Sequence, residues 1–339
     1  MIKTQLKFCI LGATSFGGRA VIDSLLSQGH NVFGIGRKDL PLEPFKISNK
    51  NFANLSWLKA DLVLDTSKIA SSINSFSPDY IIDFMGQGMV AQSWISPSQW
   101  YSTNISKKSE LLNNINWKEF LKLYIRISTP EVFGSVDGAI TEKHIFNPST
   151  PYALSHATMD QHLNLLNKQT GFPSIIARYA NFYGPSQQLY RIIPKAIYYA
   201  LTGQKLTLDG GGLSERAFIY KDDIASSIDA LITKGQVGEA YHFSDNTCVS
   251  IKSLVHNISN YCDIDFNKFT RTGADRSGKD QRYFMSTFKA RESLGWHPNT
   301  SLEQGISKTI NWVKQYKNLI TPDLLNYHHN YRENNEQNS

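Results

Sequence analysis

Short apolar runs alternate with amphipathic stretches over the first 180 residues of the chain. Short runs rich in β-branched and aromatic side chains are typical of buried strands, whereas apolar positions three or four residues apart predict helices. Alternating strands and helices imply right-handed βαβ crossovers, so we expect an α/β fold with a parallel sheet covered on both faces. The pattern predicts strands at 6–11, 31–35, 55–59, 80–84, 121–127 and 174–178, and helices at 17–28 and 151–167.

The pattern changes after about residue 180, where aromatic residues, glycine and proline become more frequent. We expect a nucleotide-binding domain over 1–180, with return segments near 217–245. A smaller mixed lid over 181–330 would cover the carboxyl ends of the strands, where ligands bind in open α/β sheets. The polar stretch 331–339 is expected to be a disordered tail. Helices in the lid are predicted at 192–201, 222–233, 251–261 and 302–316.

Composition narrows the class of protein. Hydrophobic residues make up 41% of the 339 residues and charged residues 19%, as in ordinary globular proteins. The net charge is +6, but Lys and Arg are scattered, so we expect an anionic small-molecule ligand and no nucleic acid. Cys9, Cys248 and Cys262 have no metal-ligand spacing, so no metal site and a reducing compartment are expected. No run approaches a membrane helix, and we expect a cytoplasmic protein without a membrane partner.

A glycine-rich loop follows the first predicted strand and opens a helix. It has the sequence Gly12-Ala-Thr-Ser-Phe-Gly-Gly18. Glycines at such a turn let the backbone approach a pyrophosphate, whose charge is stabilised by the helix N-terminus. The loop therefore indicates a Rossmann-type, doubly wound dinucleotide-binding fold, with an ordinary βα turn as the alternative. The candidate cofactor-binding residues here are Gly12, Thr14, Ser15, Phe16 and Gly18.

The end of the second predicted strand bears on which dinucleotide is bound. NAD-binding proteins usually place an acidic residue there to bind the ribose 2′-hydroxyl. This chain has Gly36 followed by Arg37 and Lys38. The two cations suit a 2′-phosphate, so the sequence favours NADP over NAD, the alternative being that Arg37 only stacks on adenine.

Tyr152 and His156 are four residues apart in a predicted helix and share one of its faces. A tyrosine with a pKa near 10 is a poor base at neutral pH unless a positive charge stabilises its phenolate, and a histidine is mostly neutral at pH 7. Alone, the pair could be a core aromatic and a surface histidine. Ser128 and Thr129, at the end of a strand where such sites lie, favour a functional role.

Several ordered motifs carry a resemblance to a known family. Tyr152 and His156 resemble the Tyr-x-x-x-Lys pair of the short-chain dehydrogenases, with His in place of Lys. Taken in order along the chain, the motifs resemble those of extended short-chain dehydrogenases/reductases that act on nucleotide sugars. The two nearest the C-terminus, Asp275–Tyr283 and Leu294–Pro298, favour 4,6-dehydratases over 4-epimerases. The other motifs are Ser128–Gly134, Arg178–Pro185, Arg216–Asp223, Asp275–Tyr283 and Leu294–Pro298.

The resemblance implies a nucleotide-diphosphate sugar substrate, a homodimer, and NAD or NADP held tightly and regenerated in each cycle. It implies that Tyr152 deprotonates the sugar O4 during oxidation at C4, while Thr129 binds the same hydroxyl. Glu131 would then remove the C5 proton as water leaves C6, giving a 4-keto-6-deoxy sugar. His156, at the lysine position, would bind the nicotinamide ribose, and we expect His156→Lys to leave activity intact or to shift its pH optimum downward.

The resemblance also assigns ligand-binding residues. Asp61 and its neighbour Leu62 match the position that contacts adenine, while Asn181, Arg216 and Arg282 match substrate-binding positions. Many relatives carry Asp where this chain has Pro130, so Glu131 would act both as base and as acid. A nucleotide-sugar epimerase or decarboxylase, and a non-catalytic sensor of dinucleotides or sugar nucleotides, remain alternatives.

Overall fold

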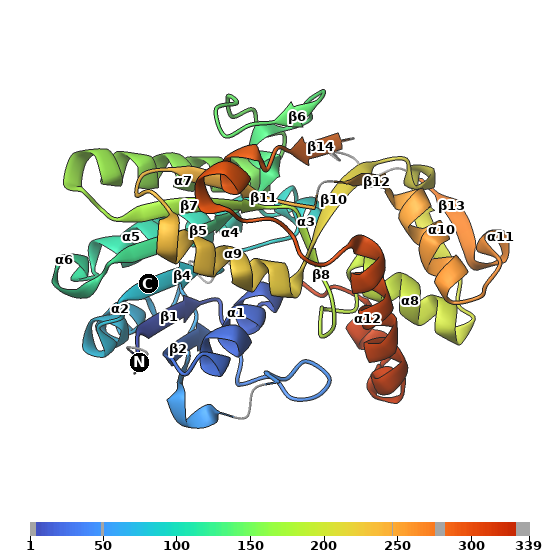
Figure 1. Cartoon of the computed structure of the whole chain (residues 1–339), viewed down its shortest axis with the longest axis horizontal. Helices are drawn as coiled ribbons and strands as arrows, with labels where there is room; N and C mark the ends of the chain where they lie inside the picture. Colours follow the sequence, from blue (N-terminus) through green and yellow to red (C-terminus); the bar gives the residue numbers. More distant parts are fainter. Residues whose placement is uncertain (1–4, 49–50, 246, 275–281, 330–339) are drawn as a thin grey trace, which may run out of the picture.

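A seven-stranded sheet forms the centre of the larger lobe, with the strand order β11-β7-β5-β4-β1-β2-β3 (Figure 1). The computed structural model describes residues 5–48, 51–245, 247–274 and 282–329. Every strand pairs in parallel with its neighbours, which confirms the predicted doubly wound α/β sheet. The strands are β1 (Lys7–Leu11), β2 (Asn31–Gly36), β3 (Leu55–Lys59), β4 (Tyr80–Asp83), β5 (Leu123–Ser128), β7 (Ser174–Tyr179) and β11 (Ala240–Phe243).

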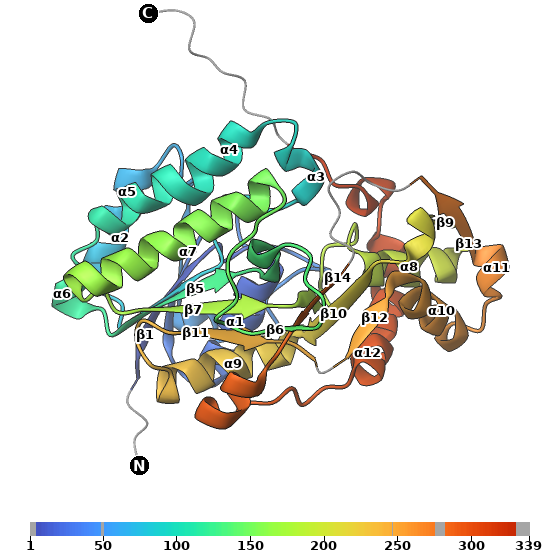
Figure 2. The ribbon, with the colours of Figure 1, turned by 90° about the horizontal axis from the view of Figure 1, so that it is seen from above.

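Alternation along the strands divides the core between the two faces of this sheet. In β1, Phe8 and Ile10 pack against one layer of helices, and Cys9 and Leu11 pack against the other. Because both faces are covered, the strands are apolar almost throughout. One layer contains α1 (Phe16–Ser27) and α9 (Lys221–Lys234); the other contains α2 (Thr66–Phe76), α5 (Lys107–Asn113) and α7 (Pro151–Thr170), as Figure 2 shows for α5 and α7.

The smaller lobe has its own core, built from three helices and short strands. Its sheet has the order β12-β10-β14-β6, with β8 beside β10, and β10 and β12 are antiparallel, so the sheet is mixed as expected. Its elements are α8 (Ile192–Thr202), α10 (Ile251–Tyr261), α12 (Leu302–Tyr316), β6 (Ala139–Ile140), β8 (Asn181–Tyr183), β10 (Glu215–Tyr220), β12 (Cys248–Ser250) and β14 (Arg282–Met285), with the pair β9 (Leu206–Asp209) and β13 (Thr270–Gly273).

Shorter helices fill the connections. They are α3 (Val90–Ser93), α4 (Pro97–Tyr101), α6 (Trp117–Phe120) and α11 (Phe266–Phe269), with a π-helical turn over Ser102–Ser106 between α4 and α5. No helix in the described part of the chain is long and apolar enough to cross a membrane. The predicted tail at 331–339 and residues 275–281 of the fourth motif lie outside the described residues.

Buried polar side chains join distant segments of the two lobes. The guanidinium of Arg19 on α1 donates to the carbonyl oxygens of Phe45 and Ser186, and burial lowers the pKa of Arg19 to about 10. The carboxylate of Asp223 in α9 accepts hydrogen bonds from the amides of Asn299, at 2.7 Å, and Thr300, at 3.3 Å. The segment that leads into α12 is therefore fixed on the helix that covers the large sheet.

The role of Asp223 can be tested against its exposed neighbour Asp222. Asp223→Ala leaves two backbone amides without their acceptors, and we expect a loss of about 2–3 kcal/mol in the free energy of unfolding. Asp222→Ala should change this free energy by less than about 0.5 kcal/mol, as at most surface sites. Denaturant titration of both variants measures the difference, and equal effects would contradict this role of Asp223.

Candidate active site

The candidate residues gather where β1, β4 and β5 end, because parallel strands place all their carboxyl ends at one edge of the sheet. The loops after these strands carry Gly12, Met85 and Thr129. Helix α7 runs along the same side and carries Tyr152 and His156. The fold thus brings together residues that the sequence analysis placed in separate motifs.

The glycine loop is closely packed against the loop after β4. Gly12 has a positive φ of 75°, and a Cβ atom there would lie 2.7 Å from the backbone nitrogen of Met85. A Cβ on Gly18 would lie 2.7 Å from the carbonyl oxygen of Gly12. Ser15 is the N-cap of α1, where its hydroxyl oxygen accepts from the Gly18 amide at 3.0 Å. This close turn at a helix N-terminus fits a dinucleotide pyrophosphate.

Other predicted cofactor residues lie at the ends of β2 and β3. Arg37 and Lys38 are exposed just beyond β2. Asp61 shapes its own turn, since its carboxylate accepts from the Val63 amide at 2.8 Å, and Leu62 is buried. Thr14 packs close to Gly36, where an added Cβ would lie 3.0 Å from the Thr14 methyl group. Phe16 is buried at the first position of α1, so its backbone faces the loop.

Thr129, Glu131 and Tyr152 form the group to which the sequence assigned proton transfer. Thr129 is the N-cap of a short 3₁₀ turn over Pro130–Phe133, and its hydroxyl oxygen accepts from the Glu131 amide at 3.3 Å. Burial and the negative charge of Glu131 raise the pKa of the Tyr152 phenol, whereas a hydrogen bond with Thr129 and the positive charge of Arg191 lower it. Tyr152 therefore needs further positive charge to act as a base near neutral pH.

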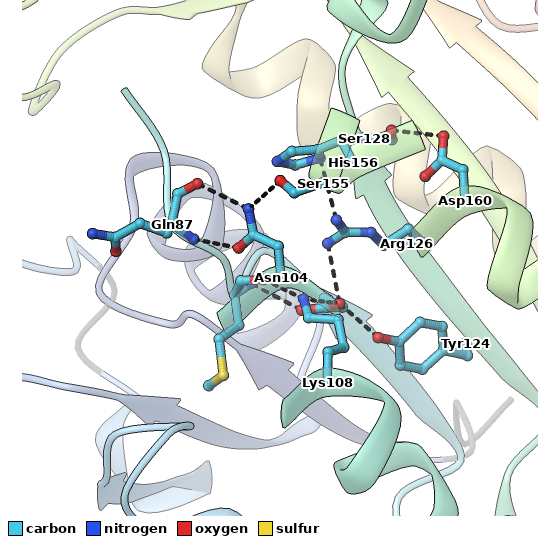
Figure 3. Close-up of polar contacts among 11 residues, drawn as sticks. Gln87, Asn104, Lys108, Tyr124, Arg126, Ser128, Ser155, His156 and Asp160 are labelled. Atoms are coloured by element: carbon cyan, nitrogen blue, oxygen red, sulfur yellow. Dashed lines mark hydrogen bonds and ion pairs between the residues drawn. The ribbon is translucent and has the colours of Figure 1, made fainter. Parts of the chain in front are cut away.

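His156 lies against Tyr152, with 4.6 Å between the ring centroids, and its far side contacts a buried polar network (Figure 3). The Nδ1 atom of His156 lies 3.2 Å from Nη2 of Arg126 in β5. Arg126, Lys108 and Tyr124 all reach the same oxygen of Asp83, at 3.3, 2.5 and 2.6 Å. Burial and the nearby cations Arg126 and Lys108 lower the pKa of His156 well below its usual value.

The buried side-chain amide of Asn104 fixes the start of α7. Asn104, in the π-helical turn, donates to the Ser155 hydroxyl at 2.9 Å and to the Gln87 carbonyl oxygen at 3.1 Å (Figure 3). Its own side-chain oxygen accepts from the Gln87 amide at 2.6 Å. Asn104 therefore links the loop after β4 to the helix that carries Tyr152 and His156.

The sequence analysis missed Asp83, Lys108 and Arg126 as well as Asn104. A signal for two of them is present in the sequence, because Asp83 and Arg126 are charged residues within apolar strand segments. Charged side chains are almost never fully buried unless they are paired. The pattern could have shown that each needs a partner, but it could not show which partner.

The predicted substrate residues lie on neighbouring strands of the smaller sheet. Asn181 in β8 donates to the carbonyl oxygen of Ala217 in β10 at 3.4 Å. Arg216 in β10 lies beside Tyr283 in β14, with its guanidinium carbon 4.4 Å from the ring centroid. Arg282 is about half exposed and pairs with Glu215 at 3.1 Å. The two arginines therefore occupy adjacent strands, with Arg216 opposite Tyr283 and Arg282 opposite Glu215.

No group of three or more His, Cys, Asp or Glu side chains that could hold a metal ion occurs among residues 5–48, 51–245, 247–274 and 282–329. The polar groups at the edge of the large sheet are instead a phenol, a carboxylate, a hydroxyl and an imidazole. They suit proton transfer next to a bound dinucleotide.

Comparisons with known proteins identify the family of the chain. A family model described as GDP-mannose 4,6 dehydratase matches residues 9–309. A probable dTDP-glucose 4,6-dehydratase from Sinorhizobium fredii is 28% identical over 335 residues, covering 91% of this chain and 92% of the relative. The dTDP-glucose 4,6-dehydratase of Salmonella typhimurium is 27% identical over 333 residues, covering 91% of this chain and 92% of the relative.

Solved structures share the whole architecture. The dTDP-glucose 4,6-dehydratase DesIV from Streptomyces venezuelae, solved with NAD bound, superposes with a TM-score of 0.86 at 25% identity and covers 94% of this chain and 99% of its own. A UDP-glucose 4-epimerase from Thermotoga maritima has a TM-score of 0.83 at 24% identity, covers 92% of this chain and 100% of its own, and shows the shared fold only.

The fold and the site define an extended short-chain dehydrogenase/reductase of the nucleotide-sugar type. Within this class, the chain belongs to the GDP-mannose 4,6-dehydratase family. The resemblance inferred from the ordered motifs is therefore confirmed.

The close packing of Gly12 can be tested with a matched glycine. Gly12→Ala combines a positive φ with a contact against backbone atoms, and we expect a loss of about 2–4 kcal/mol in the free energy of unfolding together with loss of dinucleotide binding. Gly88→Ala meets nothing within 4 Å and should leave this free energy unchanged or slightly increased. Thermal unfolding with and without dinucleotide checks both, and a Gly12→Ala protein that binds dinucleotide normally would contradict the role of this loop.

Proposed function

We propose that this protein is an NAD(P)-dependent nucleotide-sugar 4,6-dehydratase that produces a 4-keto-6-deoxy sugar nucleotide. The proposal is supported by the negative charge of Glu131, which acts on the Tyr152 phenol and raises its pKa, and by the hydrogen bond between Thr129 and Tyr152, which lowers it. A 4-epimerisation needs one base at O4, whereas loss of water across C5 and C6 needs a second group for the C5 proton. Glu131 supplies that second group.

The residues divide the proton transfers between them. Tyr152 takes the proton from O4, and Thr129 orients the Tyr152 phenol and the O4 hydroxyl of the sugar. A bound nicotinamide dinucleotide supplies a hydride acceptor for C4 and a hydride donor for C6. Glu131 removes the C5 proton, which the neighbouring C4 ketone acidifies, and then gives a proton to the departing C6 hydroxyl, which leaves as water. Once hydride has been added at C6, C5 would take a proton from solvent, and Tyr152 would release to solvent the proton that it took from O4, so the net change is loss of one water. Pro130 has no acidic group, so Glu131 is the carboxyl group of the Thr129–Glu131 segment available for both tasks.

The substrate would extend from this site to the smaller sheet. Arg216 and Arg282 carry positive charge on adjacent strands and would bind the diphosphate, while Asn181 would position the sugar nucleotide. DesIV and the two dehydratase relatives described above are named for dTDP-glucose, and the family model for GDP-mannose. We propose a nucleoside-diphosphate hexose with a 6-hydroxyl group as the substrate.

Two substitutions distinguish the oxidation at C4 from the elimination of water across C5 and C6. With dTDP-glucose, UDP-glucose and GDP-mannose as candidate substrates, Tyr152→Phe should lower kcat by roughly 10²- to 10⁴-fold. Glu131→Gln should lower dehydration to a similar extent. It should also stop exchange of the C5 proton with deuterated water. The exposed Glu119→Gln is the matched control and should behave as wild type.

Product analysis decides between the reactions that the fold can carry. A 4-keto-6-deoxy product, detected by mass spectrometry and NMR, is expected. An intact 6-hydroxyl with inverted C4 would replace the proposal by epimerisation, and release of carbon dioxide from a uronic acid substrate would replace it by decarboxylation. Turnover that survives Tyr152→Phe intact would exclude Tyr152 as the base.

We propose NADP as the preferred cofactor, because Arg37 and Lys38 are exposed just beyond β2 and Gly36 stands at its last position. Arg37→Ala should weaken NADP binding by roughly 10- to 100-fold, the value of a charge-assisted hydrogen bond, and leave NAD binding almost unchanged. Calorimetric titration of wild type and variant with both dinucleotides measures this. Tighter binding of NAD than NADP by the wild type would contradict the proposal.

A further inference from the structure

The side chain of Arg126 lies between the carboxylate of Asp83 and the ring of His156 (Figure 3). Its Nη1 atom is 3.3 Å from Asp83 Oδ2, and its Nη2 atom is 3.2 Å from His156 Nδ1. Arg126 is 1% exposed and Asp83 is fully buried, whereas His156 retains 8% of its surface. His156 is therefore the least buried member of this series.

The chemistry of the guanidinium determines the protonation state of His156. Arginine can donate hydrogen bonds but cannot accept them, so Nδ1 of His156 must accept. A neutral imidazole that accepts at Nδ1 carries its proton at Nε2. The lowered pKa of His156, caused by burial and by the cations Arg126 and Lys108, agrees with a neutral ring. His156 thus offers one N–H donor on the side of the ring away from Arg126.

Two basic side chains share one buried carboxylate in this network. Lys108 lies closer to Asp83 Oδ2, at 2.5 Å, than Arg126 does, at 3.3 Å, and Lys108 also donates to the Met85 carbonyl oxygen. Asp83 also accepts from the Tyr124 hydroxyl, at 2.6 Å, and its pKa is lowered by Lys108 and Arg126 against the effect of burial. One carboxylate thus faces two basic side chains. Burial and the charge of Arg126 lower the pKa of Lys108 to about 7, so the permanent cation of the two is Arg126, which borders the His156 ring.

We propose that Arg126 is a positioning residue for the reaction: it holds His156 as the tautomer protonated at Nε2 and places a positive charge directly behind that ring. His156 then donates a hydrogen bond where the related Tyr-x-x-x-Lys pair has an ammonium group. The positive charge next to this ring is then that of residue 126, while Arg191 is the cation that lowers the pKa of the Tyr152 phenol. This inference rests on the proposed function for its catalytic consequence, but its geometry stands without it.

The network changes the expectation for His156→Lys. From the sequence alone, lysine at this position was expected to retain activity. In the structure, its ammonium would replace the acceptor of Arg126 and face a guanidinium of the same charge. We therefore expect the single variant to lose activity, and the double variant Arg126→Met/His156→Lys to recover part of it.

The tautomer can be measured without any substrate. The chain has nine histidines, so selective ¹⁵N-histidine labelling gives few signals, and a His156→Gln spectrum assigns the one of interest. In wild type, the proton should reside on Nε2, and in Arg126→Met a population protonated at Nδ1 should appear. Lys108→Met is the matched control, since it removes the other buried cation from Asp83 and leaves Arg126 bonded to His156.

Both substitutions leave Asp83 paired with one cation, so either protein should fold, and thermal unfolding verifies this. A wild-type His156 protonated at Nδ1 would overturn the proposal, as would an unchanged tautomer in Arg126→Met. So would an equal change in Lys108→Met, because the charge of the network, rather than the contact with Arg126, would then determine the tautomer.

Kinetics tests the catalytic consequence. Arg126→Met should lower kcat by roughly tenfold or more, as removal of outer hydrogen-bond partners does. It should change KM for the sugar nucleotide by less than about threefold, which separates positioning from substrate binding. The double variant should have a higher kcat than either single variant. A double variant no better than Arg126→Met would overturn the role of Arg126. A wild type that dehydrates no sugar nucleotide would instead refute the proposed function, and the NMR result would be unaffected.

Discussion

The carboxylate of Asp83 is the point at which the sheet, the helices and the site meet. It lies at the end of β4 and accepts from Lys108 of α5 and from Tyr124 and Arg126 of β5. A buried charge costs several kcal/mol unless it is paired and hydrogen bonded, so these four side chains must keep their mutual geometry. Arg126 also contacts His156, so the same geometric requirement applies to His156 and to α7, which carries it. The rigid part of the fold therefore extends into the reaction site.

The proposed role of Tyr152 as a base has to be met without a neighbouring lysine. Burial and Glu131 raise the pKa of Tyr152, so a phenolate needs nearby donors and positive charge. Thr129 supplies a hydrogen bond, and Arg191 contributes charge from the start of α8. The Arg126 side chain adds charge behind His156. Arg191 is thus the cation that acts on Tyr152, and Arg126 the one that contacts the neighbouring His156.

The two lobes have features suited to different parts of a ligand. Gly12 and Gly18 leave no room for side chains, which makes the large sheet suited to a pyrophosphate. The smaller sheet presents Arg216 and Arg282 from neighbouring strands. Arg19 donates to the carbonyl oxygen of Ser186, and Asp223 accepts from the amide of Asn299. These bonds join the two lobes, so the separation between the two sheets is defined for a ligand that contacts both.

The sequence by itself determined the parallel sheet, the glycine loop and the family, because these depend on local periodicity, on glycine geometry and on short ordered motifs. It also placed Thr129, Glu131 and Tyr152 correctly at a strand end and on the following helix. Only the tertiary structure decided how His156 acts. Asp83, Arg126 and His156 belong to different elements, and hydrophobic patterning shows that a charged residue is buried without showing which partner it meets. That pairing arises when parallel strands and α7 assemble, so it is a property of the packed fold.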